Sequence, residues 1–135
     1  MVEQPFWTAV DHVRERDARY RREAYGFLMM ALARTVEALP AVRRADPARR
    51  HLSGPELLDG MLALARDEFG PLARAVFEEW GLERSEDVGE MVFQLVEAGQ
   101  LSARPEDRRE DFAGGGPLAS RLADPRRPAG GGSHA

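Results

Sequence analysis

Apolar residues recur every three or four positions through most of the chain, which is the spacing of one face of an α-helix. Phe6, Trp7, Val10 and Val13 indicate a short helix over residues 5–15. The longest run lies in residues 20–39, and its members are Ala24, Phe27, Leu28, Ala31, Leu32, Thr35, Val36 and Leu39. Pro40 follows this run, and a proline does not continue a helix. The first 40 residues are therefore predicted to form two helices.

The stretch RRHLSGPELLDG, residues 49–60, is predicted to begin the next helix. Ser53 with Glu56 three residues later forms a capping box, and Pro55 falls in the first turn, where its missing amide costs nothing. His51 lies close enough in sequence to be weighed as a base for a reactive Ser53. The sequence offers neither a third catalytic residue nor a glycine elbow. We interpret Ser53 as a helix cap and His51 as a loop or capping residue.

Two more helices are predicted after this one. The inner face of the 53–69 helix is Leu57, Leu58, Met61, Leu64, Ala65 and Phe69. After the Gly70-Pro71 break, Leu72, Ala73, Val76, Phe77 and Trp80 face inward, so Trp80 is expected to be largely buried. Gly81 ends that helix. The last helix is capped by Ser85 or Asp87, buries Val88, Met91, Val92, Leu95 and Val96, and stops at Gly99.

The remaining segments are predicted to be irregular or short. Residues 41–52 have no apolar period and are expected to be a loop. Residues 101–103 and 110–113 can pair as a small β-hairpin. Residues 114–135 are rich in Gly, Pro and Arg and are predicted to be a disordered tail, in which PLASRLA is either a spacer or a peptide docking motif. The expected fold is mainly α, a compact bundle of about five helices over residues 4–113, with a winged-helix-like arrangement if the hairpin forms.

Composition narrows the classes of protein. The 135 residues are 43% hydrophobic and 31% charged, as in a globular domain, and cysteine is absent, which excludes disulfides and thiolate chemistry. No apolar run approaches the roughly 20 residues of a membrane span, and the N-terminal sequence does not resemble a signal peptide. We therefore expect a cytoplasmic protein without membrane contact.

Charge is distributed unevenly along the chain. Residues 14–50 carry ten arginines against five acidic residues, a net charge of +5, whereas residues 53–113 carry six arginines against fifteen acidic residues, a net charge of −9. All 19 basic residues are arginine, as expected from a GC-rich genome or from selection for anion binding. The basic cluster Arg43, Arg44, Arg49, Arg50 and His51 is predicted to stay accessible as an anion-binding face. Internal pairing with the acidic half is the alternative.

No catalytic, cofactor or metal site is predicted. His12, His51 and His134 are far apart in sequence, and adjacent carboxylates such as Glu78 and Glu79 diverge on a helix. In a winged-helix arrangement the last helix would enter the major groove, but its outward residues are acidic and phosphates would repel them. Such a shape would serve protein contact instead.

Four segments taken together resemble a known family. They are DARYRREAYGFL, RHLSGPELLDG, FGPLARAVFEEWG and EDVGEMVFQLVEAGQLS with REDF, and they are similar to the Minf-type family of uncharacterised bacterial proteins over about residues 17–112. The resemblance implies a compact, mainly helical domain and brings no activity, cofactor or catalytic residue. The family pattern continues past the DF pair, whereas this chain departs from it at Gly114.

These observations favour a non-enzymatic function. We expect a protein-interaction or adaptor module whose partner is another protein. The alternative is a nucleic-acid-associated protein that uses the arginine-rich loop 43–51.

Overall fold

The computed structural model describes residues 4–49, 51–102, 112 and 116–122, and in them the fold is mainly helical, as predicted. The five longer helices are α1 (Gln4–Arg16), α2 (Arg22–Glu37), α4 (Gly54–Phe69), α5 (Ala73–Trp80) and α6 (Ser85–Glu97). A short helix α3 (Ala41–Ala45) and two single turns, η1 (Gly70–Leu72) and η3 (Ala119–Leu122), complete the described elements.

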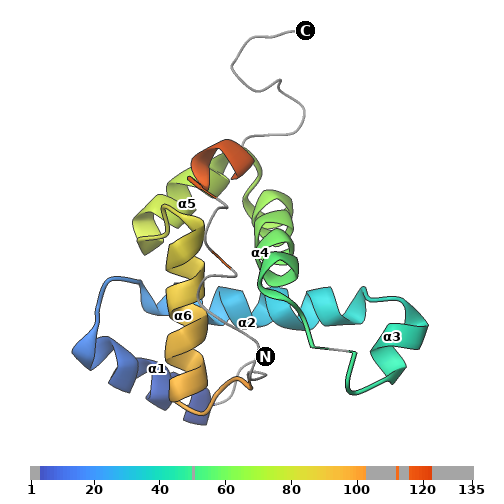
Figure 1. Cartoon of the computed structure of the whole chain (residues 1–135). Coiled ribbons are helices and arrows are strands. Elements are labelled where there is room, and N and C mark those ends of the chain that lie inside the picture. The colour runs from blue at the N-terminus through green and yellow to red at the C-terminus, as the bar shows by residue number, and fades with distance from the viewer. Residues whose placement is uncertain (1–3, 50, 103–111, 113–115, 123–135) are drawn as a thin grey trace, which may run out of the picture.

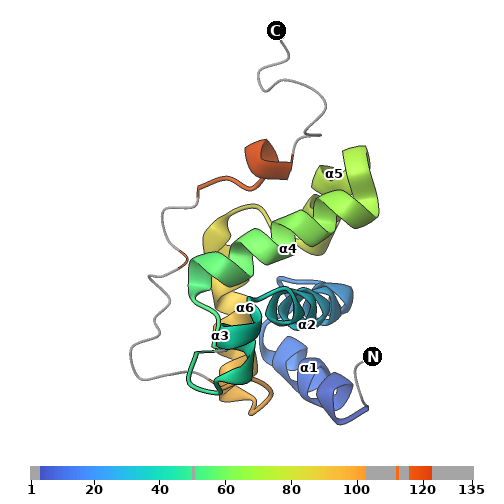
Figure 2. The ribbon, with the colours of Figure 1, turned by 90° about the vertical axis from the view of Figure 1, so that its right-hand side faces the viewer.

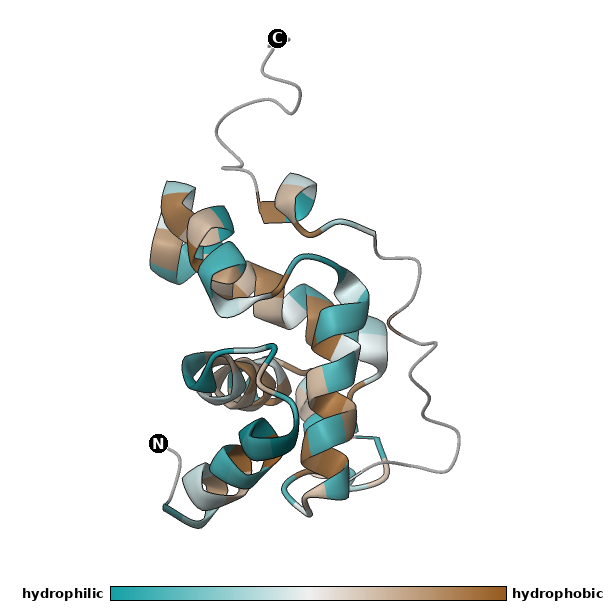
Figure 3. Cartoon of the chain, turned by 90° about the vertical axis from the view of Figure 1, so that its left-hand side faces the viewer, coloured by the Kyte–Doolittle hydropathy of each residue, from teal (hydrophilic) through white to brown (hydrophobic). Residues whose placement is uncertain are grey.

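The helices α2 and α4 form the centre of the molecule. In Figure 1, α2 runs across the lower part, α4 crosses over it, and α1 and α6 close one side. Figure 2 shows α4 lying between α2 on one side and η3 on the other. Both colours of the hydropathy scale occur along the helices in Figure 3, as expected when each helix turns one apolar face inward. The fully buried side chains come from most of these elements, and the largest include Tyr20, Tyr25, Leu28, Met61, Phe77, Met91 and Leu118.

The two helix boundaries that the sequence marked most strongly are confirmed. Ser53 is the N-cap of α4: its hydroxyl oxygen accepts from the amide of Glu56 at 3.1 Å, and the Glu56 carboxylate accepts from the amide of Ser53 at 2.8 Å. Gly81 ends α5 with φ +90°, in the left-handed region that favours glycine. A β-carbon at Gly81 would also collide with the backbone oxygen of Arg19. Both of these helix ends are thus set by local chemistry.

The start of α6 is capped by one of the two residues that the sequence offered. Asp87 is the capping side chain, since one of its oxygens accepts from the amides of Glu83 and Arg84, each at 2.9 Å. Ser85 is buried, and its hydroxyl instead donates to the backbone oxygen of Phe112. Of the two capping candidates, only Asp87 caps the helix.

Two other predictions need correction. Residues 41–52 are not wholly loop, because 41–45 form α3, a helix of five residues that is too short to show an apolar period. Leu72, predicted to face inward, is instead 65% exposed. Trp80 keeps only a minor part of its surface exposed, as predicted, and it packs against Phe27, Phe69 and Phe77 with ring centroids 5.3–5.8 Å apart. The predicted hairpin falls mostly on residues 103–111 and 113, which lie outside the described part.

The predicted boundary of the domain at residue 113 is too early. Residues 116–122 pack on the helices, and Leu118 and Leu122 are buried. The prediction of a disordered tail is therefore wrong for this segment, which we call the strap, because the PLASRL sequence docks within its own chain. Residues 123–135 lie outside the described part.

Candidate interaction sites

The arginine-rich loop is largely occupied with contacts inside the chain. The guanidinium of Arg43 binds both carboxylate oxygens of Glu56, at 2.5 and 2.8 Å. It also donates to the backbone oxygens of Arg49, at 2.6 Å, and His51, at 3.2 Å. Arg43 therefore fastens residues 43–51 to the beginning of α4, which contradicts the expectation that it stays accessible to partners.

The other described members of the predicted anion-binding face differ in their surroundings. Arg44 donates to the backbone oxygen of Glu37, at 2.8 Å, so it caps the end of α2. Arg49 is exposed and His51 is half-buried, while Arg50 lies outside the described residues. Within the described part of the loop, the side chain of Arg49 is exposed, and the structure gives its charge no role in closing the loop.

Glu56 combines two roles that the sequence showed only in part. Its carboxylate completes the capping box and also holds Arg43. The hydrogen bonds from Arg43 and from the backbone of Ser53 lower the pKa of Glu56 to about 2. Ser53 is thus structural, since its oxygen is committed to the amide of Glu56.

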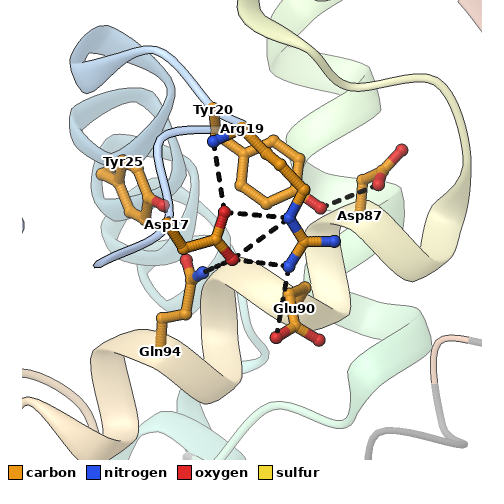
Figure 4. Close-up of polar contacts among 7 residues, drawn as sticks. All are labelled: Asp17, Arg19, Tyr20, Tyr25, Asp87, Glu90 and Gln94. Atoms are coloured by element: carbon orange, nitrogen blue, oxygen red, sulfur yellow. Dashed lines mark hydrogen bonds and ion pairs between the residues drawn. The ribbon is translucent and has the colours of Figure 1, made fainter. Parts of the chain in front are cut away.

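A second polar cluster joins the α1–α2 connection to α6 (Figure 4). The hydroxyl of Tyr25 donates to the side-chain oxygen of Gln94 at 2.6 Å, and the amide nitrogen of Gln94 donates to Asp17 at 3.0 Å. Asp17 in turn accepts from Arg19 through both of its oxygens. The hydroxyl of Tyr20 donates to Asp87 at 2.8 Å.

The groups of this cluster stabilise the packing of the α1–α2 connection against α6. The hydrogen bonds from Arg19 lower the pKa of Asp17, and burial raises the pKa of Tyr25 to about 12. The carboxylate therefore stays charged and the phenol stays neutral near pH 7. Tyr25 and Gln94 are buried and satisfy one another, so the cluster offers no free nucleophile or base.

An apolar groove runs along the outer side of the α2–α4 pair. Its floor is formed by Met29, Met30, Ala33 and Leu64, and its volume is about 530 Å³. Met30 is 51% exposed, although methionine is an apolar residue that is mostly buried in globular domains. The groove is thus a largely apolar surface that the described part of the chain leaves open to solvent.

Charged side chains border this groove. Arg34 on α2 pairs with Asp67 on α4, while Glu37 and Glu68 stand at the rim as further acidic residues. Arg44 contributes a positive charge at the end of α2, where it binds the backbone of Glu37. The carboxylates still outnumber the guanidinium groups around the groove.

Sequence reasoning missed this groove although a signal was present. The apolar run of the second helix placed Phe27, Leu28 and Ala31 on the inner face and left Met30 outside it. A group of neighbouring apolar side chains off the buried face of an amphipathic helix, rather than a single one, indicates a contact surface. The adjacent Met29-Met30 pair could therefore have been named as a candidate site.

Clusters that could hold a metal ion and membrane-spanning helices are both absent from the part of the chain that the structure describes. In residues 4–49, 51–102, 112 and 116–122, no group of three or more His, Asp or Glu side chains is arranged to hold a metal ion. No helix in that part of the chain has the length and apolarity to cross a bilayer.

No family model, no curated protein and no solved structure is similar to this chain at a significant level.

Proposed function

We propose that the chain is a non-enzymatic protein-interaction module that binds an amphipathic helix of a partner protein in the α2–α4 groove. The observation that carries the proposal is the exposed Met30 beside Met29, over an apolar floor between two helices. Methionine is flexible and polarizable, so it suits surfaces that adapt to a partner's side chains. Binding of an apolar helix face in such a groove is a common mode of recognition.

The chemistry of the rim specifies the partner further. Glu37 and Glu68 favour basic residues flanking the apolar face of the bound helix, since complementary charges steer association and orient the partner. The resemblance to the Minf-type family and a cytoplasmic location are compatible with this function. A winged-helix-like arrangement is not needed for it.

A defined peptide tests the proposal. The probe is an 18-residue amphipathic helix with leucines at i, i+3, i+4 and i+7 and arginines beside them, titrated into the ¹⁵N-labelled chain. Shifts should be confined to residues 29–37 and 64–68, and an acidic version of the peptide should bind more weakly. Equal binding of both peptides, or shifts away from these residues, would contradict the proposal.

Two matched variants separate apolar contact from charge. Met30→Gln should weaken binding of the basic peptide about tenfold, whereas Val42→Gln, which changes another exposed apolar residue outside the groove, should not. Glu37→Gln with Glu68→Gln should reduce the salt dependence of binding. If a duplex oligonucleotide instead shifts Arg49 and its neighbours with a steep salt dependence, the nucleic-acid alternative is favoured.

A further inference from the structure

The strap lies in a groove lined by α5 and the turn before α6, and it also contacts α4. Figure 2 shows η3 on the side of α4 opposite α2. Leu118 is fully buried and Leu122 is 3% exposed, so two leucines four residues apart are its apolar anchors. The strap also pairs with the backbone beside α6: Leu118 donates to the oxygen of Glu83 at 2.8 Å, and Ser85 donates to the oxygen of Gly116 at 3.1 Å. These contacts resemble those that a protein makes with a bound linear peptide.

Polar contacts fix the second half of the strap. Arg121 forms an ion pair with Asp59 on α4, and Arg66 donates to the backbone oxygen of Arg121 at 2.8 Å. The arginine immediately before the second leucine is therefore bound by an acidic residue beside the groove. The strap thus presents two leucines to the groove, with an arginine between them.

The strap does not fill its groove. A hollow of about 210 Å³ remains between the strap and α5, with Phe77, Leu82, Leu118 and Ala119 among its lining residues. Ala119 is half-buried and is the smallest strap side chain in this lining. A larger apolar side chain at the same place would gain contacts that Ala119 does not make.

We propose that this groove is a peptide-binding site, which the strap occupies in cis and which a partner protein fills with a segment of the pattern Leu-bulky apolar-x-Arg-Leu. The strap is then a competitor built into the chain. Only molecules in which the strap is released can bind the partner segment. The observed affinity is therefore the intrinsic affinity multiplied by the fraction of such molecules. The site lies across α4 from the α2–α4 groove, so it does not depend on the function proposed above.

Direct binding of a strap-derived peptide tests the proposal. The probe is a fluorescent peptide with the sequence of residues 116–122 in which leucine replaces Ala119, and it is added to the full chain. We expect weak binding to the wild-type chain and at least about tenfold tighter binding to Leu118→Asp, because an aspartate at this buried position releases the strap. The unchanged strap sequence should bind more weakly than the leucine-containing peptide.

Two further variants make the result decisive. Ala119→Leu in the full chain fills the hollow in cis, so it should raise the Tm by a few degrees and weaken binding of the peptide. Leu122→Asp, which places a charge at the second buried anchor, releases the strap if Leu118→Asp does not fold. If chains with a released strap remain folded by circular dichroism and bind the peptide no better than wild type, the groove is not a site for partner peptides.

Discussion

Two tyrosines show how the surroundings of a side chain decide what its hydroxyl contributes. Tyr25 is fully buried and donates to Gln94, which is only 8% exposed. Tyr20 is also buried, but its acceptor, Asp87, is half-buried and keeps two backbone donors on its other oxygen. Loss of the first hydroxyl leaves a buried acceptor without a partner, whereas loss of the second leaves a carboxylate that water can reach.

The first prediction compares these two residues. Tyr25→Phe should lower the unfolding free energy by about 1–3 kcal/mol, since the oxygen of Gln94 loses its donor. Tyr20→Phe is the control and should cost less, about 0.5–1.5 kcal/mol. Urea unfolding of both variants gives the comparison, and equal costs would show that burial of Gln94 does not matter.

The second prediction concerns pH and Glu56. Because its pKa in the folded chain lies at about 2, below the ordinary 4.5, its stabilising contribution is complete above pH 4.5 and is lost as the pH falls toward 2. Glu56→Gln should therefore be less stable than wild type at pH 6.5, by about 1 kcal/mol. The two chains should converge as the pH falls to 3 and below. A difference that stays constant with pH would assign the effect to packing.

At the residue scale, contacts within a few positions could be predicted and long-range ones could not. The bonds between Ser53 and Glu56 span three residues, so the sequence pattern alone implied them. The contact of Glu56 with Arg43 depends on α3, whose five residues left no periodic signal. The bond between Tyr25 and Gln94 joins residues 69 apart, and only the packed fold brings them together.

At the scale of elements, the close crossing of α2 and α4 depends on Gly60, which has no side chain. A β-carbon on Gly60 would collide with the hydroxyl of Thr35, so these helices approach more closely than other residues would allow. Thr35 lies on α2, and its hydroxyl is fixed because it donates to the backbone oxygen of Ala31 in the same helix, at 2.6 Å. Periodicity predicted both helices, since each has one apolar face, but it gave no information on how closely they pack.

The third prediction tests this crossing. Alanine favours a helix over glycine by about 1 kcal/mol, yet Gly60→Ala should be destabilising, because overpacking costs about 1–3 kcal/mol. In a Thr35→Ala background the same substitution should cost less, since the colliding hydroxyl is gone. Thermal unfolding of the four chains measures this coupling, and an unchanged cost in the second background would show that the helices simply move apart.

At the scale of the whole molecule, charge and apolar contacts connect distant parts of the sequence. Arg21 pairs with Glu79, Arg34 with Asp67 and Arg43 with Glu56, so the basic and acidic halves meet inside one chain. The sequence predicts that the basic loop remains free, because exposed ion pairs contribute only about 0–1 kcal/mol each. Their positions follow from helix packing, which the apolar residues determine.

The strap shows why composition alone misplaced the end of the domain. Gly, Pro and Arg on both sides of PLASRL lower the average hydrophobicity of residues 114–135, so this composition predicts disorder. Two leucines at the right spacing are nevertheless enough when a groove already exists to receive them. Prediction of such a groove requires the arrangement of α4, α5 and α6, which no local pattern specifies.

The position of the strap along the chain also has a consequence in time. Its ion pair joins Asp59 to Arg121, 62 residues away, whereas the helices form from contacts within a few residues. Because closing a long loop costs entropy before its contacts form, the strap should dock after the transition state for folding. Leu122→Ala should then speed unfolding and leave the refolding rate nearly unchanged in stopped-flow measurements. A slower refolding phase would instead place the strap in the folding nucleus.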